Sequence, residues 1–290
     1  MELTDLRDTP PWEWPGDAGR QIRKLLNNRN ADPAERLLAA EFAGDLTVLD
    51  NDLANVLLTV LRNNEEPEEL RAEVAIAFGP VLEMGFIEFD EELGEFDDPD
   101  ALPISLGQFH TIQDALGRVY NDPAAPKLVR RKVLEASVRA PEPWHQDAVR
   151  TAYTSADPEW VLTAVFAMQY VPGFENEILE ALNSSDPEIH FEAVVAAGEK
   201  ELKAAWPHIF SLATDDSAEK NLRIAAIGAI GSNRPQGADE LMTELADSED
   251  EDIAAAAEEV LSAEDPFEDE EDDEDDDEDD EDEDEEDGPS

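Results

Sequence analysis

The sequence contains no cysteine, and it has few bases and only four histidines. The lack of cysteine excludes disulfides, thiolate metal sites and cysteine nucleophiles. No stretch reaches the roughly 18 to 20 apolar residues that a membrane span requires. The first residues, 1–19, mix acids, Pro and Trp and lack the apolar core of a signal peptide. We therefore expect a soluble cytoplasmic protein.

Positive charge is scarce throughout the chain. The 290 residues include 75 acids against 20 Lys and Arg, which gives a formal net charge of -55. The unbroken run from Glu268 to Asp287 supplies 20 of these acids, so the rest of the chain keeps a charge of -35. Such a field repels phosphate backbones and anionic membranes, and we expect neither as a direct partner. Solubility or adaptation to a salty cytoplasm would also explain the acidity, and six Lys against 14 Arg agree with the second explanation.

A helical unit of about thirty residues repeats along most of the chain. Apolar residues at i, i+3, i+4 and i+7 predict seven helix pairs, each with a polar-faced first helix and a more apolar second helix. No segment reads as a strand. The predicted pairs are 17–28 with 32–43, 52–62 with 67–81, 109–120 with 126–138, 144–154 with 158–170, 174–182 with 187–197, 202–213 with 218–230, and 237–246 with 252–261.

Recurring turns mark the start of the second helices. An Asp before Pro supplies an oxygen that caps the helix, and Pro fits the first helical position because its φ angle is preset. Small residues recur seven positions after the acid, where bulk would push a partner helix away. The turns are Asp32-Pro33, Glu66-Pro67, Ala125-Pro126, Asp157-Pro158 and Asp186-Pro187, and the small residues are Ala39, Ala164 and Ala193.

These turns, the Arg or aliphatic residue that follows, the small residues and the period together resemble HEAT repeats over residues 17–263. The N-terminal two thirds are also similar to bacterial HEAT-like proteins with acidic tails. The resemblance implies an all-α fold, an α-solenoid of about seven helix pairs. Members of the family range from transport receptors and phosphatase scaffolds to a few enzymes, so the resemblance implies little about activity.

Three further segments complete the expected organisation. Residues 1–16 are predicted to form an arm that caps the first repeat through Trp12 and Trp14. Residues 85–107 form an insert with eight acids and no base, interleaved with apolar residues, which we expect to pack across one face of the solenoid. The tail, 264–290, is predicted to be disordered because adjacent like charges repel.

The sequence offers little for catalysis. None of the four histidines has a second His at i+3 or i+4, and no His-Glu dipeptide occurs, which argues against a zincin and against the iron ligands of HEAT-like hydroxylases. Nucleophile elbows and phosphate-binding glycine loops are absent. A HEAT-like DNA glycosylase would need a basic concave face, and nothing indicates the tetrapyrrole site of bilin lyases. We predict no catalytic residue, no cofactor, no metal and a protein that is not an enzyme.

A base or an imidazole recurs near the start of four second helices, at Arg36, Arg71, Arg130 and His190. One interpretation is that each side chain bonds the acidic turn of its own or the neighbouring repeat. The other is a positive stripe that holds carboxylates of a partner, or of the chain's own tail.

Bases, imidazoles and a Trp concentrate in the middle of the chain. Trp beside Arg is common at protein interfaces, whereas the alternative is that each Trp fills a gap between repeats. We predict that partner contacts are made by Arg130, Arg131, Arg139, Trp144, His145, Arg150 and His190.

The function expected from these patterns is a non-enzymatic, monomeric scaffold that binds another protein or peptide along the surface of its second helices. The alternative is an acidic chaperone or nucleic-acid mimic that holds a basic protein through both tail and body.

Overall fold

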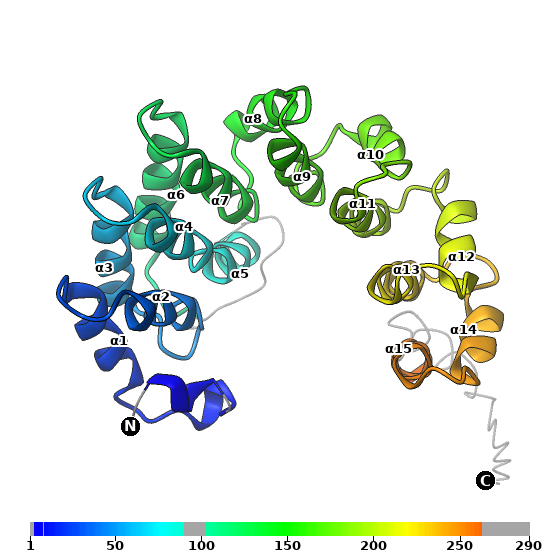
Figure 1. Cartoon of the computed structure of the whole chain (residues 1–290), viewed down its shortest axis with the longest axis horizontal. Coiled ribbons are helices and arrows are strands. Elements are labelled where there is room, and N and C mark those ends of the chain that lie inside the picture. The colour runs from blue at the N-terminus through cyan, green and yellow to red at the C-terminus, as the bar shows by residue number, and fades with distance from the viewer. Residues whose placement is uncertain (1–2, 8, 90–101, 263–290) are drawn as a thin grey trace, which may run out of the picture.

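The computed structural model describes residues 3–7, 9–89 and 102–262. The helices stack side by side into an arch, with the first helix of each pair on the outer ring and the second helix on the inner ring (Figure 1). The ends of the described chain lie at the two feet of the arch. In these ranges there are helices and no strands, and no helix is both long and apolar enough to cross a membrane. The all-α solenoid is therefore confirmed.

Seven helix pairs are present among the described residues, as the repeat pattern predicts. The first helices are α1 (Ala18–Asn27), α3 (Asn51–Arg62), α6 (Leu106–Asn121), α8 (Pro143–Tyr153), α10 (Glu175–Ala181), α12 (Trp206–Thr214) and α14 (Ala238–Ala246). The second helices are α2 (Pro33–Phe42), α4 (Glu68–Ile76), α7 (Lys127–Ser137), α9 (Pro158–Ala167), α11 (Pro187–Glu199), α13 (Lys220–Asn233) and α15 (Glu251–Ser262).

One further helix, α5 (Gly79–Phe89), follows α4 and extends the second pair. It takes in the first residues of the predicted insert, and α6 begins just before the end of that insert. Residues 90–101 and the predicted disordered tail, 264–290, lie outside the described residues, so the expected packing of the insert stays a prediction.

The second helices begin in two ways. The carboxylates of Asp32, Asp157 and Asp186 accept hydrogen bonds from backbone N–H groups in the first helical turn, as predicted for N-caps. At Pro67 and Pro126 the proline is itself the N-cap residue, and the helix starts one position later than the predicted turn implies. These two positions correct the expected register by one residue.

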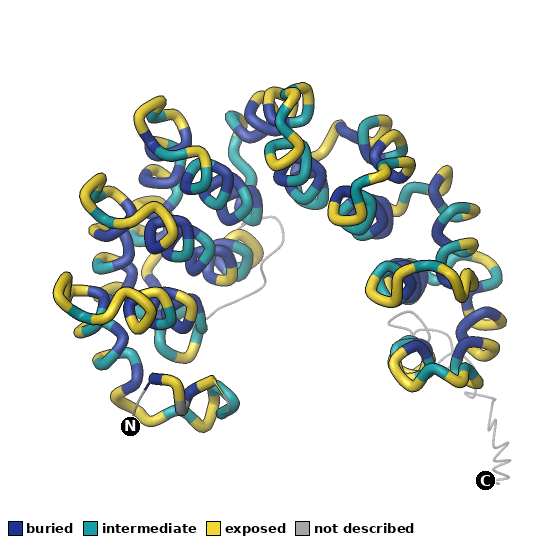
Figure 2. Tube along the Cα trace, viewed as in Figure 1, coloured by how far each residue is buried: buried dark blue, intermediate teal, exposed yellow. Residues whose placement is uncertain are grey.

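The core runs as a continuous buried layer between the two rings of helices (Figure 2). The small residues Ala39, Ala164 and Ala193 are fully buried, as close packing against a neighbouring helix requires. Because each pair covers the apolar face of the next, the core has no single centre and the fold extends by repetition.

The N-terminal arm forms two short 3-10 helices, η1 (Leu3–Leu6) and η2 (Pro11–Glu13), and packs against the first pair. Trp14 lies edge-on to Phe42 at 5.3 Å, and its indole N–H donates to the carbonyl oxygens of Leu6 and Thr9. Trp12, by contrast, is 79% exposed. The arm is therefore anchored through Trp14.

Bases tie the start of one repeat to the acidic turn of the next. Lys220 at the start of α13 reaches Asp250 and Asp252 at 2.9 and 2.7 Å, and Arg36 reaches Glu66 at 2.6 Å. Lys127 makes the same contact with Asp157 at 2.8 Å, thirty residues further along the chain. Asp157 thus has two roles, as a helix cap and as an ion-pair partner between repeats.

Consecutive second helices approach each other closely at two glycines. A Cβ added to Gly198 of α11 would lie 2.7 Å from the Cβ of Ala229 on α13, and one added to Gly231 would lie 2.4 Å from Val260. In contrast, a Cβ on Gly228 of α13 would meet no atom within 4 Å. Glycine is therefore required at the first two positions and not at the third.

Two alanine substitutions test this contact. Gly198→Ala should lower the free energy of unfolding by about 1 to 3 kcal/mol, because Ala229 leaves no room for a methyl group. Gly228→Ala is the matched control and should raise it by about 0.5 to 1 kcal/mol, since alanine loses less backbone entropy in a helix. Urea unfolding followed by circular dichroism measures both values, and a gain in both proteins would contradict the close crossing.

Candidate functional site

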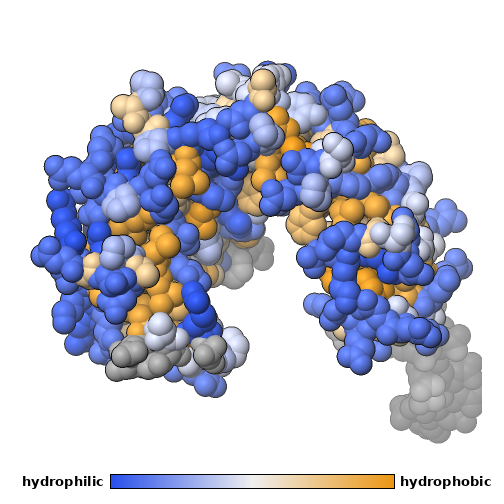
Figure 3. Space-filling view, in the orientation of Figure 1, coloured by the Kyte–Doolittle hydropathy of each residue, from blue (hydrophilic) through white to orange (hydrophobic). Residues whose placement is uncertain are grey.

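The inner ring of second helices forms a concave face that carries two grooves. Figure 3 shows hydrophobic surface over the second helices in both arms of the arch, framed by hydrophilic residues. One cavity lies toward the N-terminal arm and the other between α11 and α13. This face is the candidate functional site.

The N-terminal groove has a volume of about 580 Å³ and is formed by the arm, α2, α4, α5, α7 and α9. Its apolar residues include Trp14, Phe42, Ile76 and Phe166, and it also contains both acids and bases. The charged lining residues are Arg7, Glu41, Asp45, Glu73, Glu135 and Arg139.

Arg139 closes one side of the N-terminal groove. Its guanidinium forms an ion pair with Glu83 of α5 and lies over the rings of Phe166 and Tyr170, at 5.8 and 5.4 Å from their centres. Burial raises the pKa of the Tyr170 phenol, so this ring stays neutral at ordinary pH. The cation thus joins α5 to the repeat that follows α7.

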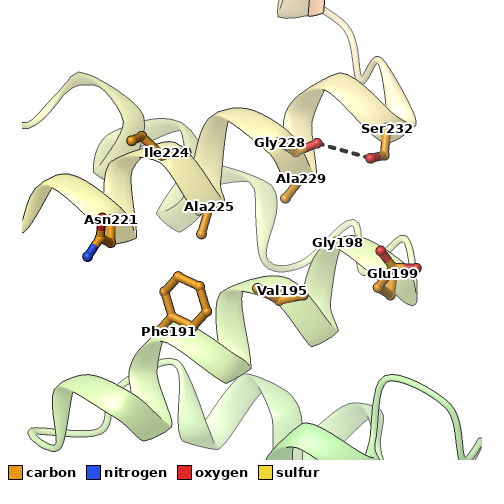
Figure 4. Close-up of a pocket in the computed structure, with 10 residues that line it drawn as sticks. All are labelled: Phe191, Val195, Gly198, Glu199, Asn221, Ile224, Ala225, Gly228, Ala229 and Ser232. Atoms are coloured by element: carbon orange, nitrogen blue, oxygen red, sulfur yellow. Dashed lines mark hydrogen bonds between the residues drawn. The ribbon is translucent and has the colours of Figure 1, made fainter. Parts of the chain in front are cut away.

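The C-terminal groove is more apolar and has a volume of about 450 Å³. Phe191 and Val195 of α11 point toward Ala225 and Ala229 of α13, and the open surface at Gly228 forms part of the wall (Figure 4). Polar groups are found at its edges, where the Ser232 hydroxyl donates to the Gly228 carbonyl oxygen at 3.1 Å.

Polar side chains on α7, α9, the turn after α9 and α11 are hydrogen-bonded to one another beside the N-terminal groove, and these are Lys132, Glu135, Thr163, Gln169 and Glu192. The Lys132 ammonium donates to Glu135, whose other oxygen accepts from the Thr163 hydroxyl at 2.8 Å. The Gln169 amide donates to Glu192 at 2.8 Å. Burial is the main cause that raises the pKa of the Glu192 carboxyl.

The bases and the imidazole that recur near the start of the second helices, which we call the ladder, are Arg36, Arg71, Arg130 and His190. The arginines of the ladder are structural features of the repeats. Each side chain stands four residues after the N-cap of its helix. Arg36, Arg71 and Arg130 donate to the carbonyl oxygen of the residue ten positions earlier, at the end of the preceding first helix. Arg36 and Arg71 are buried, so the positive stripe is not a surface of the molecule.

Sequence reasoning missed one member of this ladder. Arg223 stands four residues after the N-cap Glu219, donates to the Ala213 carbonyl oxygen at 3.3 Å and pairs with Asp216 at 3.1 Å. The spacing of four residues from the N-cap could have identified Arg223. The cap itself was not recognised in the sequence, because the turn before α13 contains no proline.

His190 departs from the ladder. Its Nε2 lies 3.0 Å from the Nε2 of His208 on α12, so one imidazole donates and the other accepts. Burial, and then the neighbouring imidazole, lower the pKa of His190. The contact therefore joins the fifth repeat to the sixth.

Trp144 and His145 belong to the packing between repeats. The Trp144 ring lies 5.1 Å from Tyr120 and its N–H donates to Glu142, while Arg130 lies over both Tyr120 and Trp160. His145 is buried, and its Nδ1 accepts from the Glu142 backbone N–H at 2.8 Å. Its Nε2 is 2.9 Å from the Ser137 hydroxyl.

The remaining predicted contact residues are separated from one another. Arg131 is buried and donates to Thr163 and Glu159, whereas Arg150 is exposed and lies over Phe174 at 5.5 Å. Arg139 lines the N-terminal groove. The structure thus brings Arg130, Trp144 and His145 together between the third and fourth helix pairs, whereas Arg139 lies on the concave face.

Residues of the concave face escaped the sequence analysis. Glu73 and Glu192 stand six residues after their N-caps, and Phe191 stands five after its N-cap. Counting from the caps would have aligned them on one face of the second helices. Among the described residues, no three His, Cys, Asp or Glu side chains gather as metal ligands.

The comparisons with known proteins agree with this architecture. Residues 175–262 match the family model for HEAT repeats. The match covers the last three helix pairs, and this part of the chain is similar to HEAT repeats. No curated protein matches the sequence. Curved stacks of such helical repeats generally provide extended concave surfaces.

Three solved structures show similar folds. The complex of CpcE and CpcF of phycocyanin lyase from Nostoc sp. PCC7120 is 16% identical, covers 88% of this chain and 90% of its own, and has a TM-score of 0.51. Human deoxyhypusine hydroxylase in complex with glycerol is 16% identical over 89% of this chain and 87% of its own, with a TM-score of 0.38. Escherichia coli YibA is 14% identical over 90% and 92%, with a TM-score of 0.44.

The similarity to the phycocyanin lyase complex corrects the prediction that the chain is not an enzyme. Phycocyanin lyase is an enzyme, and its CpcE–CpcF structure shares the fold at a TM-score of 0.51. The lack of recognised catalytic motifs therefore does not exclude an activity, and the prediction that the chain is not an enzyme was wrong.

The buried His145 provides a test of the packing between repeats. Burial lowers its pKa to about 4 from the ordinary 6.5, so it binds a proton less readily in the folded chain than in the unfolded chain. Its contribution to stability is complete above pH 6.5 and is lost as the pH falls toward 4. We expect a loss of up to about 3 kcal/mol over this range.

The measurement is the pH dependence of the free energy of unfolding of the wild type and of His145→Gln, which cannot titrate. The difference between the two proteins should change across this window in the direction stated, since the other titrating groups are common to both. Parallel curves, or a His145 imidazole that titrates near 6.5 by NMR, would contradict the burial.

Proposed function

We propose that this protein is a protein-binding scaffold whose concave face holds a segment of another protein. The observation that carries the proposal is the pair of apolar grooves on one continuous face of second helices, about 580 and 450 Å³ in volume. Each is large enough for several side chains, and pockets of this size commonly hold ligands. A partner segment that follows the inner ring would reach both.

The charges on this face favour a basic partner. The concave helices carry Glu41, Glu73, Glu135 and Glu192, and the net charge of -55 attracts cations over long range. Burial raises the pKa values of Glu73 and Glu192, which shows that water solvates their charges poorly. A cation from a partner would replace this lost solvation.

The seven contact residues predicted from the sequence enter this proposal in different roles. Arg150 is exposed and available to a partner. Arg139 lines the N-terminal groove, where its charge is already paired with Glu83. Arg130, Arg131, Trp144, His145 and His190 pack within or between repeats, and in this proposal they hold the shape of the face.

A second candidate function is an acidic chaperone that holds a basic protein through tail and body. The observation that favours it is the run of 20 acids from Glu268 to Asp287 beside a body that is itself acidic. Exposed charges act through a field that salt screens over about 8 to 10 Å at physiological ionic strength. This function would therefore be lost at high salt.

Photo-crosslinking tests the proposed face. We expect p-benzoylphenylalanine at Pro80 or Ser232, which are exposed and line the two grooves, to crosslink a discrete set of proteins in an extract of the source cells. The matched control is Asp147, which is exposed on the outer helix α8. Equal yields from all three positions, or crosslinks from Asp147 alone, would count against the concave face.

The same crosslinking separates the two functions when the chain ends at Ala263 and the salt concentration is raised. A scaffold that uses its grooves should keep its crosslinks under both changes, since buried apolar contacts are not screened. If basic proteins are captured by the full chain and lost after either change, the tail is the binding element.

A further inference from the structure

Glu73 is a carboxylate in the N-terminal groove to which the described chain gives no partner. It stands on α4, is partly buried, and makes no hydrogen bond or ion pair with the described residues. Burial, followed by the nearby charge of Glu41, raises its pKa. An ionised group that is partly removed from water and left unpaired is unfavourable, and a cation beside it would remove that penalty.

The other acids of this groove are already occupied. Glu41 pairs with Arg7 at 3.3 Å, and Asp45 accepts from the Thr47 backbone N–H at 2.8 Å. Glu135 is bonded to Lys132 and Thr163. Among the groove's described acids, Glu73 is therefore the one whose carboxylate has no hydrogen-bond or ion-pair partner.

The bases near the groove do not meet this need. Arg139 is held by Glu83 and by the rings of Phe166 and Tyr170. Lys132 lowers the pKa of Glu73 through its charge alone, because its ammonium is bonded to Glu135. An acidic partner would find no free cation here, whereas a basic partner would find a free carboxylate.

Apolar side chains flank the carboxylate. Ile76 lies one helical turn after Glu73 on α4, and the groove also contains Phe42, Trp14 and Phe166. Trp14 is fixed because its N–H is bonded to the Leu6 and Thr9 carbonyl oxygens. The groove thus places one unpaired carboxylate beside apolar side chains, which is the complement of a cationic side chain on an apolar stem.

We propose that the N-terminal groove binds a Lys or Arg side chain of a partner segment, with Glu73 as its ion-pair partner and apolar partner residues on either side of that cation. The inference rests on the proposed function and specifies the partner chemistry of one of its two grooves. Charge complementarity selects this occupant over an acidic or a purely apolar segment.

A library of random twelve-residue peptides displayed on phage and selected on the full chain tests this inference. We expect the enriched peptides to carry one Lys or Arg flanked by aliphatic or aromatic residues. Their affinity should fall about tenfold or more in Glu73→Gln, since a hydrogen bond to a charged group in a partly buried site is strong. Glu188→Gln, an exposed acid on α11, is the matched control and should change affinity less than twofold.

A double-mutant cycle locates the contact. Replacing the peptide's cation by Gln should weaken binding to the wild type and leave binding to Glu73→Gln almost unchanged. Glu41→Gln, at an exposed carboxylate of the same groove that already pairs with Arg7, is a second comparison and should weaken binding less than Glu73→Gln. Gln keeps the shape of Glu, so we expect both variants to fold, which circular dichroism verifies.

The inference is overturned if no peptide is enriched, if the enriched peptides lack a cation, or if Glu73→Gln binds them as well as the wild type does. The proposed function has a separate test in the crosslinks from Ser232 in the C-terminal groove. If those crosslinks form while the library fails, the scaffold stands and only the cation site is wrong.

Discussion

The close stacking of consecutive second helices is the constraint on which the rest of this molecule depends. A helix pair of this length cannot bury its apolar face alone, so each pair is stable only against its neighbours. Gly198 meets Ala229 and Gly231 meets Val260 at distances that exclude any Cβ. Because these contacts lie in the inner ring, they draw the second helices together and help to give the arch its concave side (Figure 1).

This stacking also determines where the few bases are used. Lys127, Lys220 and Arg36 reach the acidic turn of the following repeat, and Arg71 and Arg223 bond carbonyl oxygens at the ends of first helices. Bases placed in these contacts cannot neutralise the concave face. The acidity of that face is therefore partly a consequence of how the repeats are joined.

The helix pairs could be predicted because their causes are local. Asp32, Asp157 and Asp186 cap their helices through backbone groups two or three residues away, and the apolar period is visible in any window of about four turns. The extra helix α5 was not predicted, because its Gly79-Pro80 start resembles the end of a helix and its acids resemble a loop.

The candidate site could be predicted only in part, because exposure depends on neighbours that are distant in sequence. His145 reads as a surface imidazole beside a Trp, yet the Ser137 hydroxyl and the Glu142 backbone enclose it. Arg130 and Arg131 are adjacent in sequence but serve different contacts, one within its own repeat and one with the next. Glu73 gave no signal at all among 75 acids, since only its burial and its lack of a partner distinguish it.

Exposed acids and partly buried acids contribute differently to recognition. Exposed carboxylates raise the local concentration of basic partners, but salt screens them and each contributes little once contact is made. A carboxylate in an apolar groove is screened much less, and an unmatched partner leaves it unsatisfied, so it discriminates between partners. In the function that we propose, the overall charge of -55 would therefore govern how fast basic partners approach, while the grooves and Glu73 would govern which of them remain bound.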